Sequence, residues 1–346
     1  MSDNESPYFV ILDTNIWVTE RLLQSSLGSA VLYAVAADGA SIVLPEIVEM
    51  EVNKVLEQQA EKAVADFRKN ADFLRQISGH QKVLHSLPTS KAISDGIARR
   101  WKELSGVLIR APFTIEQARS SLIRILNHLP PSGENNEQFR DCCIWASAVE
   151  LSESRVVHLV TRDNSFYSGR DFRQNMTGVL KKELEALGRT VRLYFSVGEF
   201  IEAVSHEKLE ELEKKVICDE IVRSVTPLAQ ELAMGRVNKH AYTQYELGEA
   251  ERLEIKGYAT PRPSLVAVEF EVSFNLRLFD KEDGERQVNT ILTLDGSCSY
   301  DPSNQETSDV VVKSWNHRLK GKEGRFWSES MSDPALRDQF EQTRFV

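Results

Sequence analysis

Four short apolar runs, rich in β-branched and aromatic residues, constrain the fold of this chain more than any other feature. They cover residues 8–12, 41–44, 156–160 and 191–195. Each run is nearly continuous rather than alternating, as expected of strands that are buried on both faces. Helical patterns lie between them, over about 17–37, from about 46, over 139–151 and over 179–187. Strands that alternate with helices predict a parallel α/β sheet with right-handed crossovers.

The segment from about residue 54 to residue 128 is too long for a simple crossover. It mixes charged and apolar residues and is interrupted at Ser78-Gly79 and Leu87-Pro88. We therefore expect a helical insert. The Pro-, Gly- and Asn-containing stretch at 130–136 predicts a loop that leads into the helix at Phe139.

The pattern changes after Phe195. Residues 206–236 are helical in pattern and heavily charged, and from Leu253 onward apolar and polar residues alternate. Alternation predicts an antiparallel sheet with one face in water, and thus a C-terminal α+β domain. The predicted domains are residues 1–204, a charged helical linker at 205–245 and an antiparallel β domain at 246–346.

Composition excludes some classes of protein. The chain has 346 residues, 41% hydrophobic and 27% charged, which is ordinary for a two-domain globular protein. Its net charge of -10 argues against a protein that coats nucleic acid, but not against an enzyme with a basic rim around an acidic pocket. The four cysteines have no zinc-site spacing, and no run is long enough to span a membrane. We expect reduced cysteines and a cytoplasmic protein.

Two aspartates follow predicted buried strands. Asp13 comes directly after the first strand, and Asp163 follows the third. The carboxyl ends of parallel strands are where ligands collect in α/β sheets. A helix N-cap is an equally good explanation of either aspartate taken alone.

Two further acids lie on helix faces that should be apolar. Glu51 shares the predicted inward stripe of its helix with Val48 and Val55. Asp141 precedes Ile144 by one turn and lies in the first turn of its helix, where the dipole favours an anion.

Inward carboxylates are costly unless something compensates their charge. A nearby arginine could compensate one of them, but for four acids at one sheet edge a divalent cation is the economical solution. Oxygen ligands with no Cys or His nearby select Mg²⁺ or Mn²⁺. Two such ions can activate water and stabilise the leaving oxygen of a phosphodiester.

Four motifs, in order, resemble the PIN nuclease family over about residues 8–204. They are DTN at 13–15, LPEIVEME at 44–51, FRDCCIWA at 139–146 and TRDNSF at 161–166. The helical insert and the surroundings of Trp145 are similar to the larger multidomain bacterial branch of that family. Ser165 stands where the family often has a second acid.

The resemblance implies a PIN-like sheet flanked by helices and a metal-dependent nuclease, most often an endoribonuclease. It implies that Asp13, Glu51, Asp141 and Asp163 are the catalytic and metal-ligating residues, with Asn15 and Thr161 supporting the site by hydrogen bonds.

The leading hypothesis is an endoribonuclease, a phosphodiester hydrolase that prefers single-stranded RNA and uses Mg²⁺ or Mn²⁺. The alternatives are a catalytically weak PIN scaffold that binds RNA or protein, and a structure-specific DNA nuclease. Retention of all four acids favours an enzyme. Two further partners are a second copy of the chain and a protein bound by the C-terminal domain.

Basic residues near the insert and the fourth motif are candidate contacts for nucleic-acid phosphates. They are Arg99, Arg100, Lys102, Arg162, Arg170 and Arg173. A solvated helix face explains any one of them at least as well.

Overall fold

The computed structural model describes residues 7–78, 87–133, 138–170, 175–204, 211–239, 242–280, 287–320 and 326–332. The chain divides into two compact units. The first comprises residues up to Leu22 and from Val35 to Ala203, and the second comprises Leu23–Ala34 and the chain from Val204 onward. The predicted ends of the N-terminal domain at residue 204 and of the linker at residue 245 remain predictions.

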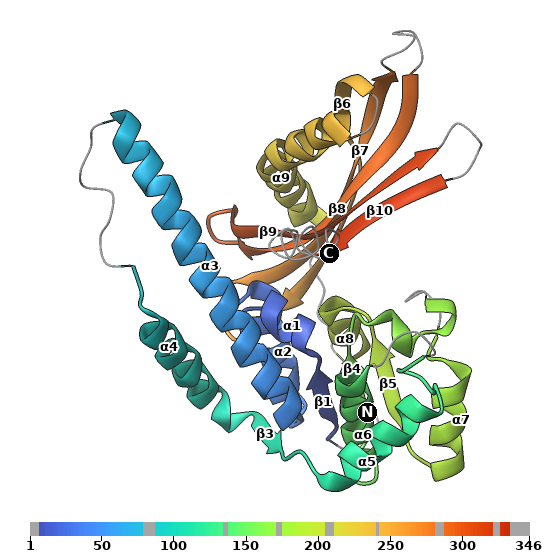
Figure 1. The fold of residues 1–346 in the computed structure, drawn as a ribbon. Coiled ribbons are helices and arrows are strands. Elements are labelled where there is room, and N and C mark those ends of the chain that lie inside the picture. The colour runs from blue at the N-terminus through green and yellow to red at the C-terminus, as the bar shows by residue number, and fades with distance from the viewer. Residues whose placement is uncertain are drawn as a thin grey trace. The chain divides into compact units, whose positions relative to one another are not determined.

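The first unit is built on a parallel five-stranded sheet of order β3-β2-β1-β4-β5 (Figure 1). Its strands are β1 (Phe9–Leu12), β2 (Ser41–Pro45), β3 (Leu108–Ala111), β4 (Val157–Val160) and β5 (Val191–Tyr194). β1 lies at the centre, paired in parallel with β2 and β4. This confirms the predicted parallel sheet. The expectation that the insert is helical throughout is wrong for β3, which adds an edge strand beside β2.

Helices connect these strands. They are α1 (Thr14–Thr19), α3 (Glu46–Ser78), α4 (Ser90–Glu103), α5 (Ile115–Leu126), α6 (Phe139–Leu151), α7 (Gly178–Leu187) and α8 (Val197–Val204). The single helix predicted over 17–37 is wrong, because α1 ends at Thr19 and α2 (Ser26–Ala37) begins anew. Between them, Arg21, Leu22 and Leu23 adopt positive φ, a conformation that no right-handed helix contains.

Helices α3 and α4 lie side by side (Figure 1). Ser94 Oγ donates a 2.6 Å hydrogen bond to Glu57, and Trp101 Nε1 donates one of 2.7 Å to Asn53. Thr89 caps α4 through the backbone N–H of Ala92. The insert is therefore anchored to α3 over the turns that follow Glu51.

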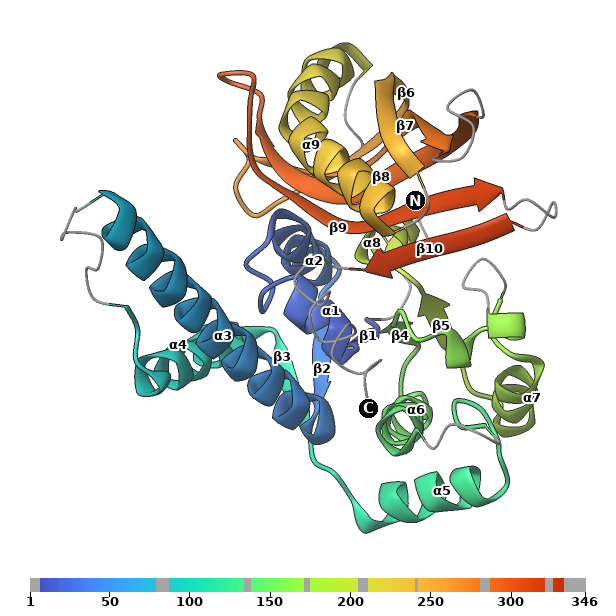
Figure 2. The same ribbon diagram turned by 45° about the horizontal axis from the view of Figure 1, so that its top comes forward.

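The second unit contains an antiparallel sheet of order β10-β9-β8-β7-β6, as predicted for the C-terminal region. Its strands are β6 (Tyr242–Ala259), β7 (Val266–Asp280), β8 (Gln287–Asp301), β9 (Glu306–Lys320) and β10 (Phe326–Ser332). Helix α9 (Glu211–Lys239) lies across the sheet (Figure 2). Its residues Ile217, Ile221 and Val225 are buried against strand residues that include Phe270 and Phe274. The charged helix is thus a structural layer of this unit.

Within the described residues, no helix is both long and apolar enough to cross a membrane. The cysteines are free thiols, and Cys142, Cys143 and Cys298 are buried.

Candidate active site

Asp13 lies at the carboxyl end of β1 and is 5% exposed. Its Oδ1 accepts the backbone N–H of Thr14 at 2.6 Å, so Asp13 is the N-cap of α1. Its Oδ2 accepts the Thr161 hydroxyl at 2.7 Å and the Asn15 amide at 3.0 Å. Burial raises the pKa of Asp13, the hydrogen bonds from Thr161 and Thr14 lower it, and the charge of Asp163 raises it further. Asp13 is therefore the N-cap of α1, and its carboxylate also interacts electrostatically with Asp163.

Asp163 lies beyond the neighbouring strand β4. Its backbone N–H donates to Thr161 Oγ1 at 3.1 Å, and its Oδ1 accepts the backbone N–H of Ser165 at 2.7 Å. Its Oδ2 accepts the amide of Gln138 at 3.1 Å. Ser165 thus contacts Asp163 through its backbone N–H. Gln138, at the start of α6, is a second contact of Asp163, and the sequence motifs do not indicate it.

Asp141 projects from the first turn of α6 toward these two aspartates. The pKa of Asp141 is raised to about 8, first by burial and then by the negative charges of Asp13 and Asp163. A hydrogen bond to Asp163 raises it further, and the charge of Arg140 lowers it. Carboxyl groups from three separate segments therefore act on one another.

Glu51 reaches the cluster from α3 by a different route. Its Oε2 accepts the Thr14 hydroxyl at 2.8 Å, next to the Asp13 cap, and its Oε1 forms an ion pair with Arg140. The Glu51 side chain is 21% exposed and that of Arg140 is 61% exposed. Thr14 and Arg140 are site residues that sequence reasoning missed, although each directly adjoins a predicted acid in its motif.

Two amide oxygens beside the acids are buried without a hydrogen-bond partner: Asn15 Oδ1 and Gln138 Oε1. Their amide nitrogens are used on Asp13 and Asp163, respectively. Buried acceptors need a donor or a cation. Carboxylate and amide oxygens together form the donor set that Mg²⁺ and Mn²⁺ prefer, so the residues present fit such an ion.

The four acids are not arranged as a ready set of ligands. No group of three or more His, Cys, Asp or Glu side chains among the described residues is placed to hold a metal ion. In this state Glu51 pairs with Arg140, and Asp141 is hydrogen-bonded to Asp163. Ligation through Glu51 Oε1 would require its ion pair to open.

The predicted phosphate contacts divide into distinct groups. Arg100 donates to the Leu22 carbonyl at 3.0 Å and pairs with Glu103 at 3.1 Å, so it has a structural task on α4. Arg99 and Lys102 are exposed on the same helix. Arg162 lies between Thr161 and Asp163, with its Nε buried and unpartnered. The side chain of Arg170 and the whole of Arg173 lie outside the described residues.

An ion pair between α5 and α7 contacts Trp145 of α6. Arg124 of α5 pairs with Glu183 of α7 at 2.5 Å and donates to the Pro130 carbonyl at 2.9 Å. Trp145 Nε1 donates to the same glutamate at 3.1 Å. This network fixes α6, and with it Asp141, between two other helices.

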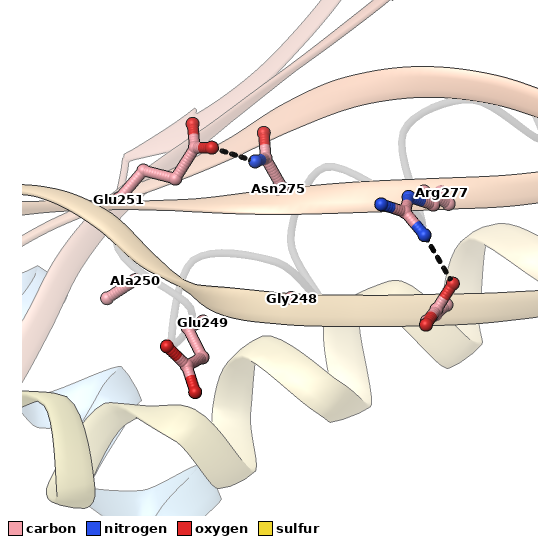
Figure 3. Close-up of a pocket in the computed structure, with 7 residues that line it drawn as sticks. Gly248, Glu249, Ala250, Glu251, Asn275 and Arg277 are labelled. Atoms are coloured by element: carbon pink, nitrogen blue, oxygen red, sulfur yellow. Dashed lines mark hydrogen bonds and ion pairs between the residues drawn. The ribbon is translucent and has the colours of Figure 1, made fainter.

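A pocket of about 400 Å³ in the second unit is lined by residues of β6 and β7 (Figure 3). Arg277 pairs there with Glu246 at 3.1 Å, and Asn275 donates to Glu251. The register of β6 shifts on either side of Ala250. A strand irregularity with internally paired side chains accounts for this pocket.

The comparisons with known proteins address the first unit. Residues 10–166 match the family model described as the PIN domain, a range that contains all four predicted acids. No curated protein matches the chain. The match is consistent with a PIN domain in the N-terminal half of this chain, and PIN domains are generally metal-dependent nucleases.

Proposed function

We propose that this protein is a metal-dependent endonuclease that hydrolyses phosphodiester bonds, with single-stranded RNA as its preferred substrate. The observation that carries the proposal is the placement of Asp141, whose pKa is raised first by burial and then by the charges of Asp13 and Asp163. Carboxylates that repel one another inside a protein are costly. Such an arrangement is reasonable where a cation offsets the repulsion. The preference for RNA rests on the family resemblance.

In this proposal Asp13, Asp141, Asp163 and Glu51 hold Mg²⁺ or Mn²⁺, with Asn15 and Gln138 as polar support. The bound ion would supply positive charge to the phosphodiester and lower the pKa of an attacking water. Thr161 holds Asp13 in one orientation through its hydroxyl, and Thr14 does the same for Glu51. Such outer hydrogen bonds orient ligands and commonly change metal affinity by about 10- to 100-fold.

One observation favours the alternative of a non-catalytic PIN scaffold. Glu51 is paired with Arg140, so the predicted site acid on α3 has a countercharge without any metal. A scaffold would bind RNA or protein with this ion pair intact. Divalent cations would then have little effect on the protein.

A cleavage assay distinguishes the metal-dependent nuclease from the non-catalytic scaffold. The full-length protein is incubated with single-stranded RNA, single-stranded DNA and the corresponding duplexes, each with EDTA, Mg²⁺ or Mn²⁺. We expect metal-dependent cuts within the single-stranded RNA, and a loss of at least about 100-fold in Asp141→Asn. Asp95→Asn, an exposed aspartate on α4, is the matched control and should cleave like the parent. Binding of RNA without cleavage under every condition would support the scaffold. Cleavage of DNA alone would show that the substrate is DNA and not RNA.

A further inference from the structure

Arg140 is the cation that acts on three of the four acids. It forms the ion pair with Glu51, and its charge lowers the pKa of both Asp13 and Asp141. It directly precedes Asp141 in the first turn of α6, and its side chain is 61% exposed. A solvent-accessible guanidinium therefore lies at the rim of the acidic cluster.

Both carboxylate oxygens of Glu51 are already in use. Oε1 is held by Arg140 and Oε2 accepts the Thr14 hydroxyl. A hard divalent cation requires at least one carboxylate oxygen to face it. Cation binding through Oε1 of Glu51 therefore competes directly with the ion pair, and it leaves the guanidinium of Arg140 without its partner.

A freed guanidinium at this position suits a phosphodiester. Its planar, forked donors match phosphate oxygens, and its charge is fixed at all physiological pH values. A substrate phosphate must approach the same rim to reach a cation held by the acids. Arg140, which pairs with Glu51 in the metal-free protein, is thus well placed to bind the phosphate once a cation has displaced it.

We propose that Arg140 is a phosphate-binding residue of the nuclease site, held on Glu51 in the metal-free protein and released to the nucleic-acid backbone when a divalent cation takes its place. The proposal rests on the proposed function. It deepens that function by assigning one residue two successive partners, an acid and then a phosphate.

The proposal predicts opposite effects of one substitution on two ligands. In Arg140→Gln nothing competes for Glu51, and one positive charge near the cation is removed. Mn²⁺ should therefore bind about 1.4- to fivefold more tightly in the absence of nucleic acid, as expected for loss of an exposed ion pair. The substrate should bind more weakly, with KM raised about tenfold or more, because a charged phosphate contact is lost.

A matched control is an arginine of β3 whose acidic partner lies on α3, the helix that carries Glu51. Arg110 pairs with Glu49 of α3 at 2.9 Å, and the two side chains are 49% and 22% exposed, close to the values for Arg140 and Glu51. Glu49 lies outside the acidic cluster. Arg110→Gln should therefore change neither Mn²⁺ affinity nor KM.

The experiment has two arms on the full-length chain. Isothermal titration measures Mn²⁺ binding without nucleic acid, and steady-state kinetics gives kcat and KM for the single-stranded oligonucleotide that the parent cleaves. In Arg140→Gln we expect tighter Mn²⁺ binding, a raised KM and a slope of log KM against log salt concentration that is shallower by about 0.7, the value for one phosphate contact on a single strand. Arg140→Lys keeps the charge, so it should retain the parent's salt slope while KM rises less.

Mn²⁺ affinity that is unchanged or weaker in Arg140→Gln would overturn the competition with Glu51. An unchanged KM and salt slope would overturn the phosphate contact. Both outcomes apply when the parent protein binds Mn²⁺ and cleaves the oligonucleotide. A parent that neither binds Mn²⁺ nor cleaves would contradict the proposed function itself, so the two failures are distinguishable.

Discussion

Thr161 donates its hydroxyl to Asp13 Oδ2 at 2.7 Å and accepts the backbone N–H of Asp163 at 3.1 Å. One side chain therefore joins the carboxyl ends of β1 and β4, which are neighbours in the sheet although they are far apart in sequence. Thr161 is fully buried, and the Tyr167 hydroxyl donates to its carbonyl at 2.9 Å. The two strand-tip aspartates are thus held by the same threonine.

Thr161→Val should destabilise the protein by about 1–3 kcal/mol, because it removes two buried hydrogen bonds at nearly constant volume. It should also weaken Mn²⁺ binding about 10- to 100-fold, since Asp13 loses an orienting donor. Thr161→Ser keeps the hydroxyl and is the control. Urea unfolding and Mn²⁺ titration measure both effects, and a valine variant that matches the serine variant in both would contradict this role.

Asp141→Asn should leave the metal-free protein at least as stable as the parent. It removes a carboxyl whose ionised form is disfavoured by burial and by two other acids, while an amide can still donate to Asp163. Mn²⁺ should raise the unfolding temperature of the parent by mass action and that of the variant much less. Thermal unfolding with and without Mn²⁺ measures this. An equal Mn²⁺ stabilisation of the variant would remove Asp141 from the site.

Asp13→Asn is a less clean probe of charge. Asp13 Oδ2 accepts from both Thr161 and Asn15, and an amide nitrogen at that position would face the donor of Asn15. Loss of stability in that variant would therefore mix lost hydrogen bonds with lost charge.

His158 on β4 predicts an acid-sensitive step in stability. It is 1% exposed, packs against Tyr8 and stacks on Tyr194, and both ring nitrogens lack hydrogen-bond partners. Burial and, after it, the charge of Arg192 lower the pKa of His158 to about 4. The unfolded chain therefore binds a proton between pH 6.5 and 4 that the folded protein excludes.

Stability should accordingly fall as pH drops through this window, by on the order of 3 kcal/mol from this group. In His158→Phe this part of the pH dependence should disappear, whatever the absolute stability. His128→Asn, at an exposed position of positive φ, is the control and should keep the parent's pH profile. Free energies of unfolding at several pH values test this, and a parallel profile in His158→Phe would contradict it.

Glu183→Gln should cost about 3 kcal/mol in stability, because it leaves the guanidinium of Arg124 buried without its countercharge. Asp141 is carried on the helix that this ion pair braces, so cleavage should fall as well. Glu185→Gln, an exposed change on the same helix α7, should be neutral. Urea unfolding of the two variants gives the comparison, and equal stabilities would show that the pair does not brace α6.

The main sheet could be predicted because its central strands are continuous apolar runs. The edge strand β3 could not, since its four residues LIRA are half exposed and lie within a polar segment. The break between α1 and α2 also escaped prediction. The apolar residues Leu22 and Leu23 continue the helical pattern in sequence, although they adopt positive φ in the structure.

In the second unit, charged residues concealed the apolar stripe of α9. Ile217, Ile221 and Val225 repeat at helical spacing, but the acids and the arginine between them suggested a charged linker. Burial against the sheet is a tertiary property that the segment alone does not reveal.

The acids could be located from sequence because each breaks a local rule. Asp13 and Asp163 end buried strands, while Glu51 and Asp141 interrupt apolar helix faces. The side chains that meet them could not be located in this way. Gln138 contacts Asp163 from 25 positions away, and the pairing of Arg140 with Glu51 joins two helices, so both depend on the folded arrangement.

The proposed metal site can be tested by locating Mn²⁺ in a crystal of the full-length protein from its anomalous scattering. We expect a peak ligated by Asp13 and Asp141 together with Asp163 or Glu51, with the ion pair between Glu51 and Arg140 opened. A saturating Mn²⁺ soak that gives no peak among these acids, or a peak held by other residues, would contradict it.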